Sequence, residues 1–353
     1  DVEIRLLNND ILSNIDFNFD VKKKLYSIKS AKIQYKGINF LSKEIQITPP
    51  KFSGRDLQIE GDISHKTINL DSEQLSIFFK QGSENLKHVK LSSDNSFKLY
   101  IKKNKIKSYH IDSKIKLDKL NYKIDQAKLK EYIPNFKGSI DFEDHEIKLR
   151  TEKDVFIAQG EGNHLIGTQP EKINYKITAG RKSNRIRFET KINIHESPLN
   201  IEFLNYQKKE NKDSTLFIKG NIGEKNIWFN KILFNESKNN FLINKLHLTK
   251  DLKIKSINLA DLDFVNNKRN SLGMWLYNDG AATLKSYCGS TIANMLNNRS
   301  SREQSIREIL IKSLPSSHLK FFNDLFKTLT NLTGTFISIK IAIFLQVAIS
   351  ALI

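Results

Sequence analysis

Apolar and polar residues alternate along most of this chain, from Ile33 to Phe264. The run Lys114-Ile115-Lys116-Leu117 shows the rule, and Ile173, Tyr175 and Ile177 repeat it with polar residues between them. A period of two places alternate side chains on opposite faces of a β-sheet. Turn signals recur at roughly the 8- to 12-residue spacing that is typical of an all-β array. We therefore predict a mainly β fold, a long curved antiparallel sheet shaped as a groove, with a C-terminal helical segment.

The pattern changes near residue 266. We expect an extended β-sheet domain over 1–265, a polar break with amphipathic helices over 266–334, and an apolar helix over 335–353. The last segment carries Lys340 as its only charge, and about 20 apolar residues suffice to cross a bilayer. It is a candidate membrane segment, with a buried helix or the tail of a truncated or frame-shifted reading frame as alternatives. Because the chain begins at Asp1 rather than Met and ends in this apolar run, we expect a fragment of a longer protein.

Two shorter features interrupt the alternation. Leu75, Phe78 and Phe79 have helical spacing, which predicts a short helix within residues 70–79. The glycines of Gly160-Glu161-Gly162 predict a turn.

The charge of the chain is strongly positive, with a formal net charge of +18. Alone, that charge would suggest a nucleic acid or an anionic membrane as partner. The basic residues are nearly all Lys, however, and they are spread along the strands, often near Asp or Glu. The aromatic residues lie mostly in the apolar phase, so they are not interleaved with basic residues as a base-stacking platform requires. We therefore predict solvated strand faces and no nucleic-acid partner.

The sequence offers no strong chemical motif. Gly162 and Gly167 have the spacing of a phosphate loop, but no Lys follows Gly167. The acidic cluster 141–146 places Asp141, Glu143 and His145 on one face of a regular strand and scatters the other carboxylates, which disfavours a cation site. An enzyme on this scaffold would need a cluster of polar residues in the apolar phase, and the pattern suggests none. We expect no catalytic residues, no metal and no cofactor.

A sheet with one apolar face needs something to cover that face. If the sheet curls into a groove, the apolar side suits acyl chains, since each buried CH₂ is worth about 0.8 kcal/mol. The alternative is the closed core of a structural or adhesive β-scaffold that binds no ligand. The residues that we expect to line the groove share the apolar phase of the central strands: Ile115, Leu117, Tyr122, Ile173, Tyr175, Ile177, Ile201, Phe203, Leu216 and Ile218.

Three segments carry a resemblance to a known family. They are Phe156–Gly162 followed by Gly167 and the strand 173–177, Leu259–Phe264 followed by a polar loop, and Tyr287-Cys288-Gly289-Ser290 leading into Ile292 and Leu296. In its general pattern of strands and turns, over roughly residues 109–300, the chain resembles the AsmA-like envelope proteins of Gram-negative bacteria, in particular the YhdP-type branch.

The resemblance implies a periplasmic body built as a β-groove and anchored to the inner membrane. It also implies phospholipid acyl chains as ligand, contacts with the membrane and with envelope protein partners, and a part in phospholipid transport between the inner and outer membranes or in outer-membrane integrity. Members of the family usually carry an N-terminal membrane anchor, which this chain lacks, and the apolar C-terminal tail departs from their pattern.

Overall fold

The structure is a computed structural model. It describes residues 4–5, 11–22, 25–50, 56–78, 85–103, 105–124, 130, 133–152, 154–167, 169–180, 183, 185–201, 206–250, 254–256, 258–265, 271–278 and 284–288. Of the predicted C-terminal segments, the amphipathic helices and the apolar helix over 335–353 lie outside these residues. In the part of the chain that the structure describes, no helix is both long and apolar enough to cross a membrane.

The described chain is almost entirely β-strand. In its first half the elements are β1 (Ile4–Arg5), β2 (Ile11–Lys22), β3 (Leu25–Tyr35), β4 (Ile38–Thr48), β5 (Leu57–Asp71), α1 (Ser72–Phe78), β6 (Leu86–Lys102), β7 (Lys105–Lys123), β8 (Ser139–Glu152) and β9 (Val155–Leu165). In its second half they are β10 (Glu171–Gly180), β11 (Ile186–Asn193), β12 (Leu199–Ile201), β13 (Tyr206–Lys208), β14 (Ser214–Ile222), β15 (Asn226–Glu236), β16 (Asn239–Thr249), β17 (Ile254–Ser256), β18 (Leu259–Val265), β19 (Ser271–Asn278) and β20 (Leu284–Cys288).

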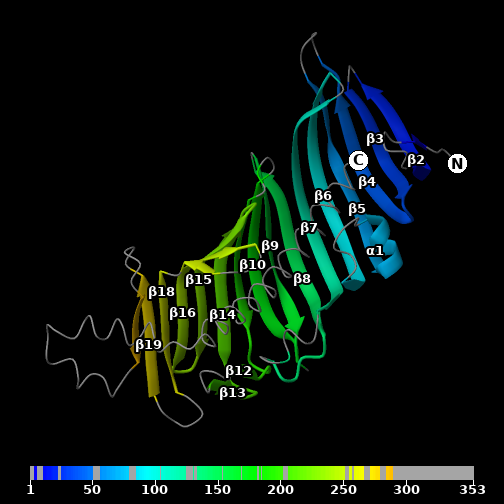
Figure 1. Ribbon diagram of the computed structural model, residues 1–353. Coiled ribbons are helices and arrows are strands. Elements are labelled where there is room, and N and C mark those ends of the chain that lie inside the picture. Colours follow the sequence, from blue (N-terminus) through cyan, green and yellow to red (C-terminus); the bar gives the residue numbers. More distant parts are fainter. Residues whose placement is uncertain are drawn as a thin grey trace.

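Nearly every strand pairs antiparallel with its neighbour in sequence. Among the described residues, one sheet holds 18 strands, and a second, small sheet pairs β12 with β13. In the large sheet β11 pairs with β14, so the β12–β13 hairpin is an excursion between them. Figure 1 shows the large sheet as one continuous, twisted layer from β2 to β19. The prediction of a mainly β fold built on one large antiparallel sheet is confirmed.

Alternation decides which face of the sheet is buried. In β10, Ile173, Tyr175 and Ile177 are buried, while Lys172 and Lys176 between them are exposed. The same two-residue alternation of buried and exposed residues occurs in β7, β8 and β14. Residues that lie opposite each other in paired strands point to the same face of the sheet. One face of the sheet is therefore an apolar face and the other a polar face, as the sequence predicts.

β-Bulges keep side chains on the apolar face where the alternation in the sequence is interrupted. Asp144 has a φ of 53°, and the β8–β9 register shifts between Glu143 and Glu146. The extra residue lets Phe142 and His145 both point to the apolar face although three positions separate them. The prediction that Asp141, Glu143 and His145 share one face is therefore wrong for His145.

Longer connections gather at one end of the strands. α1 follows β5, residues 124–138 join β7 to β8, and the β12–β13 hairpin joins β11 to β14. Figure 1 places α1 and the β12–β13 hairpin at the same, lower ends of the strands. At the opposite ends several turns are tight, as between Lys102 and Lys105 or between Glu152 and Val155, and β17 lies there between β16 and β18. Among the described residues, α1 and the β12–β13 hairpin thus border the sheet along one side.

Three local expectations have clear outcomes. The short helix expected within residues 70–79 is α1. The turn expected at Gly160-Glu161-Gly162 is wrong, because these residues lie in the middle of β9. The sheet also continues beyond residue 265, where we expected it to end, through β19 and β20.

Candidate functional site

The apolar face is the candidate site. Seven of the ten residues expected to line it are buried on it, with 1–7% of their surface exposed: Ile115, Leu117, Ile173, Tyr175, Ile177, Leu216 and Ile218. Tyr122 is half-buried and packs against the same cluster. Ile201 lies in β12, outside the large sheet, and Phe203 lies outside the described residues.

The apolar face is continuous across the sheet. One contiguous cluster of buried apolar side chains runs from Tyr35 in β3 to Phe264 in β18. Directly paired residues carry it from strand to strand, for example Ile115 with Ile147 between β7 and β8, and Ile218 with Ile232 between β14 and β15. The buried apolar cluster is therefore unbroken from β3 to β18.

Strand β9 leaves room on this face for side chains of the neighbouring strands, because Gly160 and Gly162 have no side chains. The rings of Tyr175 and His145 lie over them, so that a Cβ on Gly160 would stand 2.5 Å from Tyr175 Oη and one on Gly162 would stand 2.3 Å from His145 Cδ2. His145 Nε2 lies 2.9 Å from the carbonyl oxygen of Asn163, to which it must donate. His145 Nδ1 therefore accepts from the Tyr175 hydroxyl at 3.2 Å. This buried pair is fully bonded, and burial raises the pKa of Tyr175.

Sequence reasoning missed a group of polar residues in the apolar phase. Glu171, Ser214 and Glu236 are all buried, and each lies at a strand end beside the connection between β11 and β14. Glu171 Oε1 accepts from the backbone N–H groups of His195 and Glu196. The signal was present in the sequence, since Glu171 precedes Ile173 in the same phase.

Other members of this group hold the β12–β13 hairpin against the sheet. Tyr206 donates its hydroxyl to Glu236, and its ring packs edge-on against Phe241 with centroids 4.9 Å apart. Lys208 is fully buried, and its Nζ donates to the carbonyl oxygens of His195 at 2.8 Å and Ser197 at 2.7 Å. These groups bond to backbone and to one another, so their arrangement serves structure rather than chemistry on a substrate.

Burial dominates the electrostatics of this hairpin. Loss of hydration raises the pKa of Glu171, which the two backbone N–H groups and Lys208 only partly offset. Loss of hydration also lowers the pKa of Lys208 despite the attraction of Glu171 and Glu236.

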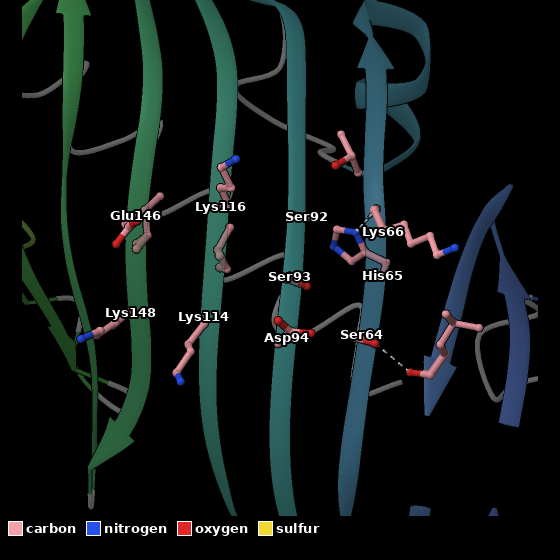
Figure 2. Close-up of a pocket in the computed structure, with 14 residues that line it drawn as sticks. Ser64, His65, Lys66, Ser92, Ser93, Asp94, Lys114, Lys116, Glu146 and Lys148 are labelled. Carbon is pink, nitrogen blue, oxygen red and sulfur yellow. Dashed lines mark hydrogen bonds between the residues drawn. The ribbon is translucent and has the colours of Figure 1, made fainter. Parts of the chain in front are cut away.

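A hollow of about 870 Å³ crosses strands β4 to β8. Figure 2 shows its lining, with Lys114 and Lys116 on β7 beside Glu146 and Lys148 on β8. Lys66, Lys114, Lys116 and Lys148 outnumber the two carboxylates, Asp94 and Glu146. Lys116 pairs with Asp118 at 3.4 Å, whereas Lys114 and Lys148 form no ion pair with another described residue. The hollow therefore carries an excess of positive charge.

No cation site emerges from the acidic cluster of β8. Lys119 pairs with Glu143 at 3.6 Å, Asn121 donates to Asp141 at 2.6 Å, and the bulge turns His145 to the apolar face. Within the described ranges, no group of three or more His, Cys, Asp or Glu residues could hold a metal ion.

Comparison with family models, with curated proteins and with solved structures gave no match to this chain.

Proposed function

We propose that the apolar face is a groove that holds phospholipid acyl chains and that the protein takes part in phospholipid transport between the inner and outer membranes of a Gram-negative envelope, or in outer-membrane integrity. The observation that carries the proposal is the unbroken apolar cluster from β3 to β18 on one face of a single sheet. A path along such a face offers a hydrocarbon chain apolar side chains from one strand to the next.

The energetics of the apolar face favour acyl chains over a compact ligand. Each CH₂ removed from water contributes about 0.8 kcal/mol, so a chain of about sixteen carbons gains on the order of 10 kcal/mol without any polar contact. The charged side chains buried in the apolar phase, Glu171 and Glu236, lie at strand ends and are bonded within the protein. They leave the middle of the face without a buried carboxylate or ammonium group.

The polar face suits a groove whose outer side lies in water. Its lysines are solvated, and several pair across strands, as Lys98 does with Glu60 and Lys219 with Glu189, both at 2.9 Å. The periplasmic location, the inner-membrane anchor and the envelope protein partners belong to the same proposal and rest on the resemblance to the AsmA-like proteins.

A structural scaffold with a closed core is the second candidate. The observation that favours it is the low exposure of the apolar-phase residues, such as 1% for Ile173 and 4% for Ile177. A sealed core and an acyl-chain groove make opposite predictions about bound lipid.

Native mass spectrometry of the full chain, purified from a bacterial envelope, tests the proposal, with lipid extraction of the same sample. We expect phospholipid at a stoichiometric level. A folded protein free of lipid would overturn the acyl-chain proposal in favour of the scaffold.

A pair of substitutions in β10 sharpens this test. Ile177→Asp places a charge on the apolar face, where it should abolish lipid co-purification while the protein stays folded, because a carboxylate in contact with hydrocarbon is costly. Lys176→Asp, one position away on the polar face, is the matched control and should retain lipid. If Ile177→Asp or Ile173→Asp unfolds the protein outright, as judged by circular dichroism, that result would favour the closed-core scaffold over the acyl-chain groove.

A further inference from the structure

Two lysines lie directly opposite each other in the hollow that crosses β4 to β8. Lys114 of β7 faces Lys148 of β8 in the antiparallel register, and both side chains are exposed on the polar face (Figure 2). Both strands lie inside the sheet, because β7 also pairs with β6 and β8 also pairs with β9. Side chains at directly opposite positions start about 5 Å apart, and like charges there destabilise a sheet. This lysine pair is therefore unfavourable unless a negative group compensates it.

A second lysine pair on the polar face has such compensation. Lys90 of β6 lies directly opposite Lys119 of β7. A carboxylate oxygen of Asp118 lies 3.8 Å from Lys90 Nζ, and one of Glu143 lies 3.6 Å from Lys119 Nζ. Each ammonium group of this pair thus has its own carboxylate partner within the protein.

The pair in the hollow lacks partners of this kind. Asp94 lies opposite Lys114, but neither Lys114 nor Lys148 forms an ion pair with a described residue. With its histidine neutral, the hollow is lined by four lysines and two carboxylates, which leaves a net charge of +2. A hollow lined mainly by one sign of charge concentrates ions of the opposite sign. The missing counter-charge therefore points to an anionic ligand.

We propose that the hollow is a binding site for a phosphomonoester, whose phosphate group contacts both Lys114 and Lys148. A phosphomonoester carries close to two negative charges at neutral pH, which matches the net charge of the lining. Lysine binds phosphate as a point charge, so two ammonium groups can share one phosphate group. Ser92 lines the same hollow, and its hydroxyl group has no hydrogen-bond partner among the described residues, so it can donate to the ligand. The site lies on the face opposite the proposed acyl-chain groove, and its test is independent of that proposal.

Isothermal titration calorimetry of the full chain with glycerol phosphate at low ionic strength tests the site. Lys114→Gln and Lys148→Gln should each weaken binding by about tenfold or more, because each variant loses one charged donor to the phosphate. Lys119→Gln is the matched control, since it removes the same charge from the other lysine pair, and it should bind like the parent. Dimethyl phosphate, a diester with a single charge, should bind more weakly than glycerol phosphate.

Two results of this titration would overturn the proposal. The first is a parent protein that does not bind glycerol phosphate. The second is an equal loss of affinity in Lys119→Gln and Lys148→Gln, because the overall charge of the polar face would then account for the binding.

Lys148→Glu separates loss of the site from loss of the fold. The new carboxylate lies opposite Lys114 and replaces a like-charge pair with an opposite-charge pair. The variant should therefore lose binding of glycerol phosphate while its Tm without ligand rises above that of the parent. A lower Tm would contradict the unfavourable lysine pair from which the site is inferred, and retained binding would overturn the site itself.

Vesicles distinguish a lipid headgroup from a soluble ligand as the source of the phosphate. The full chain is sedimented with phosphatidylcholine vesicles that contain or lack phosphatidic acid, whose headgroup is a phosphomonoester. Binding that requires both phosphatidic acid and Lys148 would identify a lipid headgroup. Binding of glycerol phosphate without binding to either kind of vesicle would identify a soluble ligand.

Discussion

At the scale of single residues, the glycines of β9 allow large rings onto the apolar face. Gly162 lies directly beneath the imidazole of His145, and Gly160 beneath the phenol of Tyr175. Each ring fills the space that a side chain on β9 would occupy. The glycines are thus part of the packing of the face and not of a turn.

Gly162→Ala should destabilise the protein by about 2 kcal/mol, because the added methyl group overlaps the His145 ring and backbone. Urea unfolding at neutral pH measures the loss. Gly167→Ala is the matched control, since its Cβ would meet only Ser197 Oγ at 3.6 Å. Equal stability of the two variants would show that the imidazole moves aside freely.

The buried carboxyl of Glu171 predicts a pH dependence. Burial raises its pKa in the folded state above the ordinary 4.5, so the folded state favours the protonated form. The contribution of this carboxyl to the free energy of unfolding is fully present below its pKa in the unfolded state. It is lost as the pH rises through the raised pKa of the folded state. Glu171→Gln keeps an oxygen acceptor for the two N–H groups and removes this loss. We expect the variant to gain stability relative to the parent as pH rises from 4.5 to 8 in urea unfolding; a constant difference over that range would contradict the assignment.

The sequence predicts the phase of a residue well and its local exceptions poorly. Alternation places Ile173, Tyr175 and Ile177 on the buried face, because a strand has only two sides. It places His145 wrongly, since a bulge at Asp144 depends on how β8 pairs with β9. It gives Glu171 no role, because the backbone groups that Glu171 binds lie more than twenty positions further along the chain.

At the scale of elements, α1 begins with a reciprocal pair of hydrogen bonds. Asp71 Oδ1 accepts from the backbone N–H of Gln74 at 2.9 Å, and Gln74 Oε1 accepts from the N–H of Asp71 at 3.2 Å. This is a capping box, which satisfies N–H groups that lack partners within the helix.

Asp71→Ala should weaken α1 by about 1 kcal/mol, because the helix loses its N-cap acceptor. The rate of amide hydrogen exchange at Ser72–Phe78 measures the stability of this helix, and exchange should be faster in the variant. Asp71→Asn retains an acceptor oxygen and should stay close to the parent. Unchanged exchange in Asp71→Ala would mean that packing of Leu75 alone holds the helix.

Lys208 fixes the β12–β13 hairpin through backbone carbonyl groups. Its Nζ also donates to the carbonyl oxygen of Lys209, at 3.2 Å. Lys208→Met should cost about 3 kcal/mol, because buried acceptors lose a charged donor. Lys209→Met, next to it and exposed, should be nearly neutral in the same thermal or urea unfolding measurement. A mild effect at Lys208 would indicate that water can replace the ammonium group.

Strand periodicity predicts most elements but not the hairpin. The alternation continues through Leu199, Ile201 and Phe203, so the sequence suggests another strand of the large sheet there. β11 instead pairs with β14, and β12 and β13 form a separate small sheet in which Tyr206 lies among Phe234, Phe241 and Phe264. Pairing partners follow from tertiary contacts, which a period of two does not encode.

At the scale of the whole molecule, the two faces and the two sets of strand ends differ. The apolar face is continuous, the polar face carries the lysines, and α1 and the β12–β13 hairpin lie at one set of strand ends. The sequence predicts the first two properties from alternation and composition. The third depends on which loops have enough apolar residues to fold back, as Ile133 and Phe136 do.

The order in which the strands pair has a consequence for how this chain folds. Since nearly every strand bonds to its neighbour in sequence, most contacts close short loops, which favours rapid folding. Each new hairpin can add to an edge that is already formed, in the manner of repeat proteins that contact only their neighbours. A chain emerging from a ribosome or a translocation channel can thus build its sheet strand by strand, without waiting for its last residues.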